Sequence, residues 1–319
     1  MGIKCNVAII GAGYMAREHI RAFQDISGVV VTGLYTRTLV RGMSLAEEFN
    51  IKIVSNSIAD LYKRANADLV VVCVPELSAE EVLQECFNYS WHVLAEKPIG
   101  YNLHQAEALT QLAINKNRNV YVALNRRHYA STVAMLNDIQ GDNGARFIKI
   151  QDQESPRLAL VAGQPDLVVQ NWMYANSIHL IDFFTILGRG QIIEVVPIIP
   201  WNKNKPSTVI AKIIFDSGDI GLYEATWDAP GPWAVSVNTE RVRWELRPIE
   251  VATYQQYGQR ASQQVPINQL DEKFKPGLRR QAELAIERVS GKANDLPTIS
   301  QSLNTMRLID RIYNNTECL

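Results

Sequence analysis

A lysine stands where a short apolar run ends, in the stretch AEKPIG (95–100). The preceding residues HVLA are typical of a buried strand, which Pro98 prevents from continuing. A lysine before a proline is most often a polar turn residue. If the strand belongs to a parallel sheet, however, Lys97 lies at the carboxyl edge where such sheets bind ligands, and its ammonium can donate to a substrate oxygen.

Three polar residues interrupt an otherwise apolar helical pattern, NSIHLIDFFTIL (176–187). His179, Asp182 and Thr185 are spaced i, i+3, i+6 and therefore fall along one stripe of the helix. Buried histidine and aspartate need polar partners or a cavity. A structural His–Asp pair would satisfy that need, but Lys97 in the other half of the chain favours a stripe that lines an active-site cleft.

A glycine-rich turn, GAGYMA (11–16), follows the first apolar run and opens an amphipathic helical pattern. In this G-x-G-x-x-A pattern, Gly11 permits the tight turn, Gly13 lets the backbone approach a pyrophosphate, and Ala16 lets helix and strand pack closely. The helix N-terminus adds free N–H groups and a partial positive charge. The pattern therefore predicts a dinucleotide site rather than a plain turn.

The end of the second strand, LYTRT (34–38), indicates which dinucleotide is bound. NAD-selective sites usually carry Asp or Glu here, which bonds the ribose 2′-hydroxyl. This chain has Thr36 and Arg37, with Arg41 one helical turn further on. Arginine matches a 2′-phosphate through two parallel hydrogen bonds. We therefore expect NADP(H) as the preferred cofactor, with NAD(H) as the alternative; a surface arginine without a role is the plainer interpretation.

Apolar runs and helical patterns alternate through the first third of the chain. Strands are expected at 6–10, 29–35, 68–75, 92–96 and 119–125, and helices at 14–23, 80–89 and 102–116, the last capped by Asn102. Strands this apolar are buried on both faces. Their alternation with helices predicts a doubly wound parallel sheet, a dinucleotide-binding Rossmann domain over residues 1–124.

Beyond residue 125, period-two alternation appears in several runs. These runs are 147–153, 192–199, 208–215, 219–227, 233–238 and 241–254, and helical patterns lie at 176–187, 277–289 and 302–315. Such alternation favours a sheet with one exposed face. The chain is thus expected to be α/β, with a C-terminal α+β domain over residues 125–319 that contains a large, mostly antiparallel open sheet. The final helix is a candidate to pack back on the first domain.

Composition limits the function classes. The 319 residues are 47% hydrophobic with a formal net charge of -1, which gives no sign of a nucleic-acid partner or a membrane-seeking surface. The opening apolar run is too short for a signal peptide. The 4 cysteines lie far apart without a CxxC pair, so we expect no metal site and a reducing compartment. These features predict a cytoplasmic protein.

Five stretches together carry a family resemblance: GAGYMA, VVVCVP, HVLAEKPIG, NRRHY (125–129) and the H-x-x-D of His179 and Asp182. In order and approximate spacing the chain resembles, over essentially its whole length, the glucose–fructose oxidoreductase/inositol dehydrogenase/MocA (Gfo/Idh/MocA) family. The EKP of the third stretch is the most specific mark. The resemblance implies pyridine-nucleotide-dependent redox chemistry on sugars, cyclitols or similar polyols. It also implies a homodimer or homotetramer formed through the open sheet.

The resemblance also implies roles for the matching residues. Lys97 would bond the reacting oxygen, His179 would exchange the proton, and Asp182 would orient the substrate or His179, while a hydride moves between nicotinamide C4 and a substrate carbon. The candidate cofactor-binding residues are Gly11, Gly13, Tyr14, Met15, Ala16, Thr36, Arg37, Val74, Pro75, Glu96 and Lys97. The candidate substrate-binding residues are Arg126, Arg127, Trp172 and Tyr174, although a surface ion pair explains either arginine equally well.

Two departures bear on the substrate. Ala175 stands where many polyol-oxidising relatives have an aspartate, and Ser78 and Ala79 stand where a histidine is familiar, so inositol-type oxidation is less expected. The leading hypothesis is an NADP-dependent oxidoreductase that acts on a carbonyl or hydroxyl carbon of a sugar or nucleotide-sugar. One alternative is a reductase or dehydrogenase of a small non-sugar carbonyl or diol. The other is a non-catalytic NADP-sensing regulatory protein, which would need neither Lys97 nor His179.

Overall fold

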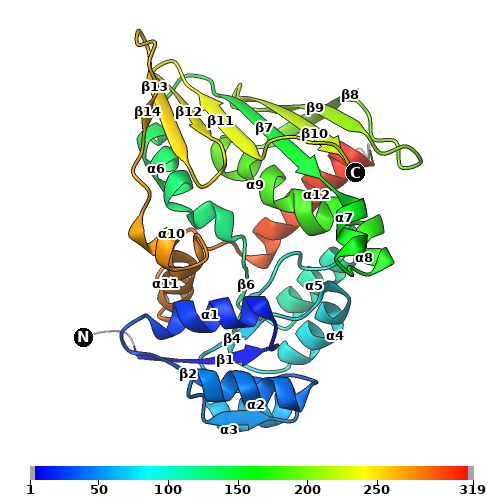
Figure 1. Ribbon diagram of the computed structural model, residues 1–319, viewed down its shortest axis with the longest axis vertical. Coiled ribbons are helices and arrows are strands. Elements are labelled where there is room, and N and C mark those ends of the chain that lie inside the picture. The colour runs from blue at the N-terminus through cyan, green and yellow to red at the C-terminus, as the bar shows by residue number, and fades with distance from the viewer. Residues whose placement is uncertain (1–3, 315–319) are drawn as a thin grey trace. The chain divides into compact units, whose positions relative to one another are not determined.

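The computed structural model of the protein describes residues 4–314. The chain folds into two compact units, Met1–His128 with Leu270–Leu303 and Tyr129–Gln269 with Asn304–Leu319. Each unit is built on one sheet, as Figure 1 shows. Within the described residues, no helix combines the length and the apolar character needed to cross a membrane.

The first unit contains six parallel strands in the order β3-β2-β1-β4-β5-β6. They are β1 (Cys5–Ile10), β2 (Val29–Tyr35), β3 (Ile53–Ser55), β4 (Leu69–Val72), β5 (His92–Ala95) and β6 (Val120–Val122). Every residue of β4 is buried, because this central strand is covered on both faces. The strand order reverses between β1 and β4, and doubly wound sheets bind their ligands at the carboxyl edge at such a point.

Helices connect and cover these strands. They are α1 (Tyr14–Gln24), α2 (Leu39–Glu48), α3 (Ile58–Ala65), α4 (Glu76–Cys86), α5 (Leu103–Asn115), the 3-10 helix η1 (Asn125–His128), α10 (Gln269–Lys273) and α11 (Leu278–Val289). The predicted cap of α5 is confirmed, because the Asn102 side-chain oxygen accepts a hydrogen bond from the Gln105 amide at 2.9 Å.

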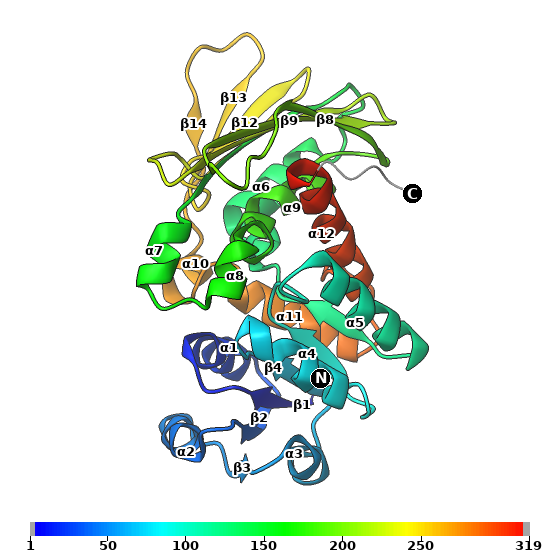
Figure 2. The ribbon, with the colours of Figure 1, turned by 90° about the vertical axis from the view of Figure 1, so that its right-hand side faces the viewer.

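Helix α11 belongs to the first unit although the whole second sheet separates it from β6 in the sequence. It packs against α1, and the two helices lie side by side in Figures 1 and 2. Ala16 and Ile20 of α1 share one apolar core with Leu278, Ala282 and Ala285 of α11. The predicted second domain, 125–319, therefore contributes Leu270–Leu303 to the first unit.

The second unit contains eight strands in the order β14-β13-β12-β11-β7-β10-β9-β8. They are β7 (Phe147–Glu154), β8 (Ile192–Ile199), β9 (Thr208–Phe215), β10 (Ile220–Trp227), β11 (Ala234–Asn238), β12 (Val242–Leu246), β13 (Ala252–Gln256) and β14 (Gln263–Gln264). Only the β7–β10 pair among these is parallel. Alternate residues of β7, β9 and β10 are buried, so one face of the sheet forms a core and the other does not.

The helices of the second unit are α6 (Ala130–Ile139), α7 (Pro156–Val161), α8 (Asp166–Gln170), the π-helix η2 (Met173–Ser177), α9 (Ile178–Leu187) and the part of α12 (Ile299–Tyr313) that begins at Asn304. Of these, α6 and α9 lie against the buried face of the sheet (Figure 2). Helix α9 approaches the sheet closely at Gly221, where a Cβ atom would lie 2.6 Å from the Phe184 ring. Phe183, Phe184 and Tyr223 are fully buried at this interface.

The predicted fold class is confirmed: a Rossmann-like parallel sheet is followed by a large, mostly antiparallel sheet. The prediction omitted α2, β3 and α3. For β3 the reason is its length, because a three-residue strand is too short to show a period. The run 241–254, taken as one segment, divides into β12 and β13 at Pro248, whose missing N–H cannot continue a ladder.

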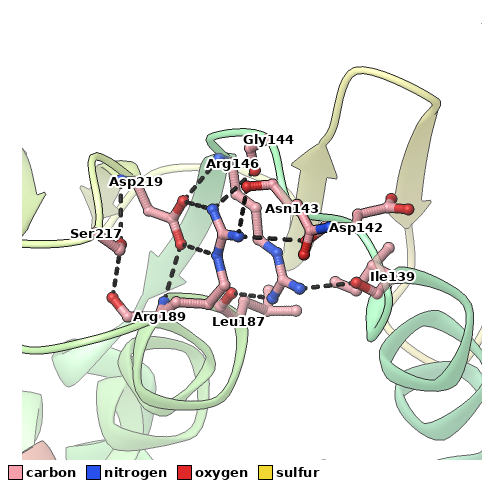
Figure 3. A network of polar contacts seen from close by, with 9 residues as sticks. All are labelled: Ile139, Asp142, Asn143, Gly144, Arg146, Leu187, Arg189, Ser217 and Asp219. Atoms are coloured by element: carbon pink, nitrogen blue, oxygen red, sulfur yellow. Dashed lines mark hydrogen bonds and ion pairs between the residues drawn. The ribbon is translucent and has the colours of Figure 1, made fainter.

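A buried carboxylate connects three parts of the second unit (Figure 3). Asp219 is fully buried and accepts hydrogen bonds from the backbone amides of Arg146 and Arg189 at 2.8 and 2.9 Å, and from the Arg189 guanidinium at 2.5 and 3.0 Å. The Arg146 guanidinium in turn donates to the carbonyl oxygens of Leu187 and Ile139 at 2.8 and 2.7 Å. These carbonyls end α9 and α6, where a cation is favourable.

The charge of Asp219 stabilises the fold in a defined pH range. Burial opposes ionisation, but the hydrogen bonds from Arg189 and from the two backbone amides outweigh it, so the pKa of this carboxyl lies below its ordinary 3.8. A carboxyl with a lowered pKa in the folded chain adds stability above its unfolded value. That stability is lost as the pH falls through the folded value.

We predict that Asp219→Asn lowers the free energy of unfolding by about 3 kcal/mol at pH 7, because the Arg189 guanidinium loses its charged partner. Denaturant unfolding followed by circular dichroism measures this. The difference from the wild type should shrink as the pH is lowered below 3.8, since protonation weakens the same contacts. The control, Asp60→Asn, removes an exposed pair with Arg64 and should leave the transition almost unchanged. Coincident wild-type and Asp219→Asn transitions at pH 7 would contradict the role of the network.

Candidate functional site

The glycine turn lies between two strands of the first unit. Gly11 follows β1 and has a φ of +118°, which side chains other than glycine rarely adopt. A Cβ atom at this position would lie 2.2 Å from the carbonyl oxygen of Cys73, the residue after β4. The Gly11 amide donates to the Tyr35 carbonyl at the end of β2, at 2.8 Å. The turn is therefore held in the gap where the strand order reverses.

The N-terminus of α1 faces open space beside this turn. Gly13 is the N-cap residue, and among the described residues no side chain caps the helix. Apart from the two neighbours of Gly13 in the chain, no described residue has an atom within 4 Å of a Cβ placed on it. Ala16 is fully buried against the sheet. Uncapped N–H groups and the helix dipole fit a pyrophosphate in that space. Tyr14 is 63% exposed with the Lys275 ammonium 5.2 Å from its ring centroid, and Met15 packs partly into the core.

The end of β2 presents two arginines to solvent. Arg37 and Arg41 are exposed, and neither forms a salt bridge within residues 4–314. Thr36 is half-buried against Gly42 of α2, where a Cβ would lie 2.8 Å from the threonine methyl group. Both arginines are thus accessible to an anion beside the same edge of the sheet.

Lys97 lines a small pocket at the carboxyl ends of β4 and β5. The pocket is also lined by Val74, Glu76, Ala95, Glu96 and Pro98. Pro75, which is exposed, is the N-cap residue of α4, and the Lys97–Pro98 peptide bond is cis. The strand ends at Ala95, one residue earlier than the predicted 92–96, so Lys97 comes two residues after it.

Glu96 has a partner that the sequence did not indicate. Its Oε1 lies 2.8 Å from Nε2 of His19, a fully buried residue of α1, while the Glu96 side chain is 15% exposed. The carboxylate therefore connects the helix that starts at the glycine turn with the residue next to Lys97. Only long-range pairing brings these residues together, so no local motif could have revealed the contact.

The H-x-x-D stripe lies on α9 of the second unit. His179 and Asp182 are both buried. Asp182 Oδ1 accepts hydrogen bonds from the Thr305 hydroxyl of α12 at 2.7 Å and from the Thr185 hydroxyl at 3.3 Å. Its carboxylate thus attaches α9 to α12. Two members of the predicted stripe, Asp182 and Thr185, therefore use their polar atoms in contacts within the second unit.

The two aromatic candidates before α9 lie in different surroundings. Tyr174 is buried and donates to Asp310 of α12 at 2.7 Å; burial and, next to it, Asp310 raise the pKa of this phenol. Trp172 is half-buried, and its indole Nε1 donates to Glu154 at 2.6 Å. Both side chains thus use their polar atoms within the second unit.

Arg126 and Arg127 lie on η1, and both are half-buried. The next residue, His128, is almost fully buried. Burial and then the charges of Arg127 and Arg280 lower the pKa of its imidazole to about 3. His128 is therefore neutral near pH 7 and cannot supply a proton there.

The sheet of the first unit brings several predicted cofactor residues to one carboxyl edge. These are Gly11, Gly13, Thr36, Arg37, Val74, Pro75, Glu96 and Lys97. The candidates His179, Asp182, Trp172 and Tyr174 belong to the second unit. Sequence reasoning missed His19 and Glu154, which bond Glu96 and Trp172 through contacts between distant segments.

We predict that the two glycines of the turn separate folding from binding. Gly11→Ala should destabilise the protein by roughly 3 kcal/mol or more, because the methyl group meets the Cys73 carbonyl at a left-handed φ. Gly13→Ala should leave the melting temperature nearly unchanged and weaken cofactor binding about tenfold, a loss of about 1.4 kcal/mol, by filling the space for the pyrophosphate. Thermal melts and cofactor titrations measure both effects. Wild-type affinity in Gly13→Ala would refute the placement of the pyrophosphate.

Comparison with known proteins agrees with this geometry. Residues 5–124 match the family model described as "Oxidoreductase family, NAD-binding Rossmann fold" (Gfo/Idh/MocA). The chain is similar to the 4-carboxy-2-hydroxymuconate-6-semialdehyde dehydrogenase of Sphingobium sp., at 23% identity over 192 residues, which cover 59% of this chain and 60% of that protein. The chain spans no more than 60% of the curated relatives that it matches.

Two solved structures extend the likeness to the whole fold. UDP-N-acetylglucosamine 3-dehydrogenase GnnA from Acidithiobacillus ferrooxidans superposes with a TM-score of 0.77 at 15% identity, covering 99% of this chain and 98% of that one. A variant of KijD10, a 3-ketoreductase from Actinomadura kijaniata solved with TDP-benzene and NADP, gives 0.72 at 16% identity, with coverages of 97% and 96%. The fold is shared with both. Over residues 5–124 the chain is similar to the Gfo/Idh/MocA oxidoreductase family.

Proposed function

We propose that the protein is an NADP-dependent oxidoreductase that transfers a hydride between nicotinamide and a carbonyl or hydroxyl carbon of a sugar or nucleotide-sugar. The observation that carries the proposal is the open, uncapped N-terminus of α1 beside Gly11, within the residues that match the NAD-binding family. Similarity to a UDP-N-acetylglucosamine 3-dehydrogenase and to a 3-ketoreductase supports a nucleotide-linked sugar.

Three residues of this chain have roles in the proposed reaction. Bound nicotinamide supplies the hydride that adds to the carbonyl carbon. The Lys97 ammonium donates a hydrogen bond to the carbonyl oxygen and stabilises the negative charge that develops on it. His179 then gives its proton to that oxygen, which becomes the hydroxyl, and the reverse transfer serves oxidation. Asp182, held by Thr305, keeps the helix that carries His179 in place.

Other histidines of the chain fit the proton step less well. His19 is fully buried in a contact with a carboxylate, and His128 is neutral because its pKa lies near 3. His92 is the first residue of β5, so it lies at the amino edge of the sheet, away from the predicted cofactor edge. His104 is exposed in the first turn of α5. These observations support His179 as the proton-exchanging group.

A second candidate function is favoured by one comparison. The Sphingobium relative is named as the dehydrogenase of a carboxylated semialdehyde, so a small non-sugar carbonyl is the alternative substrate class. Arg126 and Arg127 would then bind a carboxylate rather than a phosphate. Turnover of NADPH with a panel of keto-sugars, nucleotide-keto-sugars and semialdehydes distinguishes the two classes. If no compound is turned over and NADPH binding changes the affinity for a partner protein, the regulatory alternative is favoured.

We predict that Lys97→Ala and His179→Ala each lower kcat by about 10²- to 10⁴-fold, because each removes one group that acts on the reacting oxygen. Steady-state kinetics measure this loss. Cofactor affinity should stay within a few-fold of the wild type in His179→Ala, whereas Lys97→Ala, which also changes a candidate cofactor-binding residue, is compared by kcat at saturating cofactor. The matched controls are Lys63→Ala and His104→Ala, which change exposed residues on α3 and α5 and should keep wild-type turnover. Full activity in both Lys97→Ala and His179→Ala would eliminate this mechanism.

We predict that Arg37→Ala weakens NADPH binding about tenfold and leaves NADH binding within about twofold, because a charge-assisted contact to the 2′-phosphate is lost. Fluorescence titration with both cofactors checks this. Arg64→Ala removes another exposed arginine of the first unit and should affect neither cofactor. Tighter binding of NADH than of NADPH by the wild type would overturn the assignment to NADP(H).

The proposal includes a homodimer or homotetramer formed through the second sheet. Phe147 and Ile220 are exposed, are paired at the start of β7 and β10, and alternate with the buried residues of these strands, so they lie on the face of the sheet opposite its core. An exposed apolar patch within a polar surface is typical of a protein–protein interface. Sedimentation of a single species with the mass of one chain would exclude this assembly at the concentrations tested.

The proposed location is the cytoplasm. Three cysteines, Cys5, Cys73 and Cys86, are buried free thiols, and burial raises the pKa of Cys5 to about 12. The fourth, Cys318, lies outside the described residues. Unreactive thiols of this kind are typical of a reducing compartment but do not require one. Cell fractionation with an antibody to the protein tests the location.

A further inference from the structure

Two carboxylates lie close together inside the second unit. Asp152 and Glu154 occupy alternate positions at the end of β7, so both point to the buried face of the sheet, and neither is more than 1% exposed. Within residues 4–314, no lysine or arginine forms a salt bridge with either of them. Buried carboxyl groups without cations need several hydrogen-bond donors or a shared proton.

Glu154 obtains its donors from one short segment of the chain. Its Oε2 accepts from the Trp172 indole at 2.6 Å and from the Asn176 amide at 2.8 Å, and its Oε1 accepts from the Ser177 hydroxyl at 3.1 Å. These three residues belong to, or directly precede, η2, which continues into α9. A single side chain of the sheet therefore holds the whole turn that comes before His179.

The position of these donors relates the contact to His179. Asn176 and Ser177 lie on η2, which continues directly into α9 two residues before His179, so the contacts of Glu154 fix the segment from which the helix of His179 starts. This turn, η2, is π-helical, a geometry that is often found at functional sites. If this turn relaxed by one residue to α geometry, every later side chain would rotate by about 100° around the helix axis. By holding the turn, Glu154 thus opposes a change that would rotate the His179 side chain around the helix axis.

We infer that Glu154 is a positioning residue for His179, which it holds in its working orientation by bonding Trp172, Asn176 and Ser177. The inference rests on the proposed function only for the role of His179 in the reaction. The contact between the carboxylate and the turn, and the orientation of the imidazole, can be measured without turnover.

Asp152 completes the environment of this carboxylate. Its Oδ2 accepts a hydrogen bond from the Tyr223 hydroxyl of β10 at 2.8 Å. The Tyr223 hydroxyl also lies 2.8 Å from the Tyr313 hydroxyl of α12, and the Tyr313 hydroxyl lies 3.5 Å from Ser177 Oγ. Burial raises the pKa of both carboxyls, and for Glu154 the charge of Asp152 adds to it. The pair therefore retains a proton to higher pH than an exposed carboxyl.

The test compares Glu154→Gln with a matched control, Glu224→Gln, which alters a half-exposed glutamate on the neighbouring strand β10. The amide fills the same volume but brings an N–H group toward donors. We expect kcat to fall at least tenfold in Glu154→Gln, with KM and cofactor affinity within about threefold of the wild type, and no change in Glu224→Gln. Wild-type kcat in Glu154→Gln would overturn the inference, provided that His179→Ala is inactive.

An exchange of groups separates positioning from simple loss of stability. In the double variant Glu154→Gln, Asn176→Asp, the amide and the carboxylate change places, so that an amide on β7 can donate to a carboxylate on the turn. We expect this variant to recover at least half of the wild-type kcat. A double variant that folds but is no more active than Glu154→Gln would contradict positioning through this contact.

A readout without turnover keeps this test separate from that of the proposed function. The chain has 5 histidines, so the imidazole signals of the histidine-labelled protein can be resolved by nuclear magnetic resonance and that of His179 assigned from its loss in His179→Ala. The His179 signal should shift in Glu154→Gln and not in Glu224→Gln. If Glu154→Gln does not fold, Asn176→Ala, which removes one donor, takes its place. An unshifted His179 signal overturns the inference even if no substrate is found.

Discussion

The parallel direction of β1, β2, β4 and β5 is the constraint on which the first unit depends. Because these strands run the same way, the residues that follow them meet at one edge, although they are far apart in sequence. Gly11, Arg37, Val74 and Lys97 each follow a different strand. The gap between β1 and β4 admits the turn only because Gly11 has no side chain to meet Cys73. The cofactor edge is therefore a consequence of strand direction and one backbone conformation.

The helix that carries His179 is attached by two carboxylates with opposite electrostatic surroundings. Near the C-terminal end of this helix, Asp219 is bonded by Arg189. This contact keeps the pKa of Asp219 low, so its carboxylate stays charged near pH 7. Before the N-terminal end of the helix, Glu154 is bonded by neutral indole, amide and hydroxyl donors, and burial raises its pKa. A guanidinium compensates a buried charge more fully than neutral dipoles do. The contact of Asp219 thus stabilises the fold, and the contacts of Glu154 hold the turn that precedes His179.

Sequence patterns predicted the elements whose signals are local. The apolar runs identified β1, β2, β4 and β5, and the glycine turn and Lys97 followed from their ends. The same patterns could not show that Glu96 bonds His19, because the two residues are 77 positions apart. They could not assign Glu154 either, since an acidic residue at the end of an alternating strand is typical of an exposed position. Tertiary pairing, which leaves no local period, decides these roles.

Ala175 lies on η2, the turn that Glu154 bonds through Asn176 and Ser177. Ala175 is buried and lies in the sequence between Trp172 and Asn176, whose polar hydrogens already serve Glu154. A carboxylate at position 175 would add a further buried charge to a segment whose donors are in use. Such a charge is unfavourable unless a substrate or cation compensates it. An acid at position 175 is therefore unfavourable in this chain, and the buried acid that is present, Glu154, bonds the turn that precedes His179.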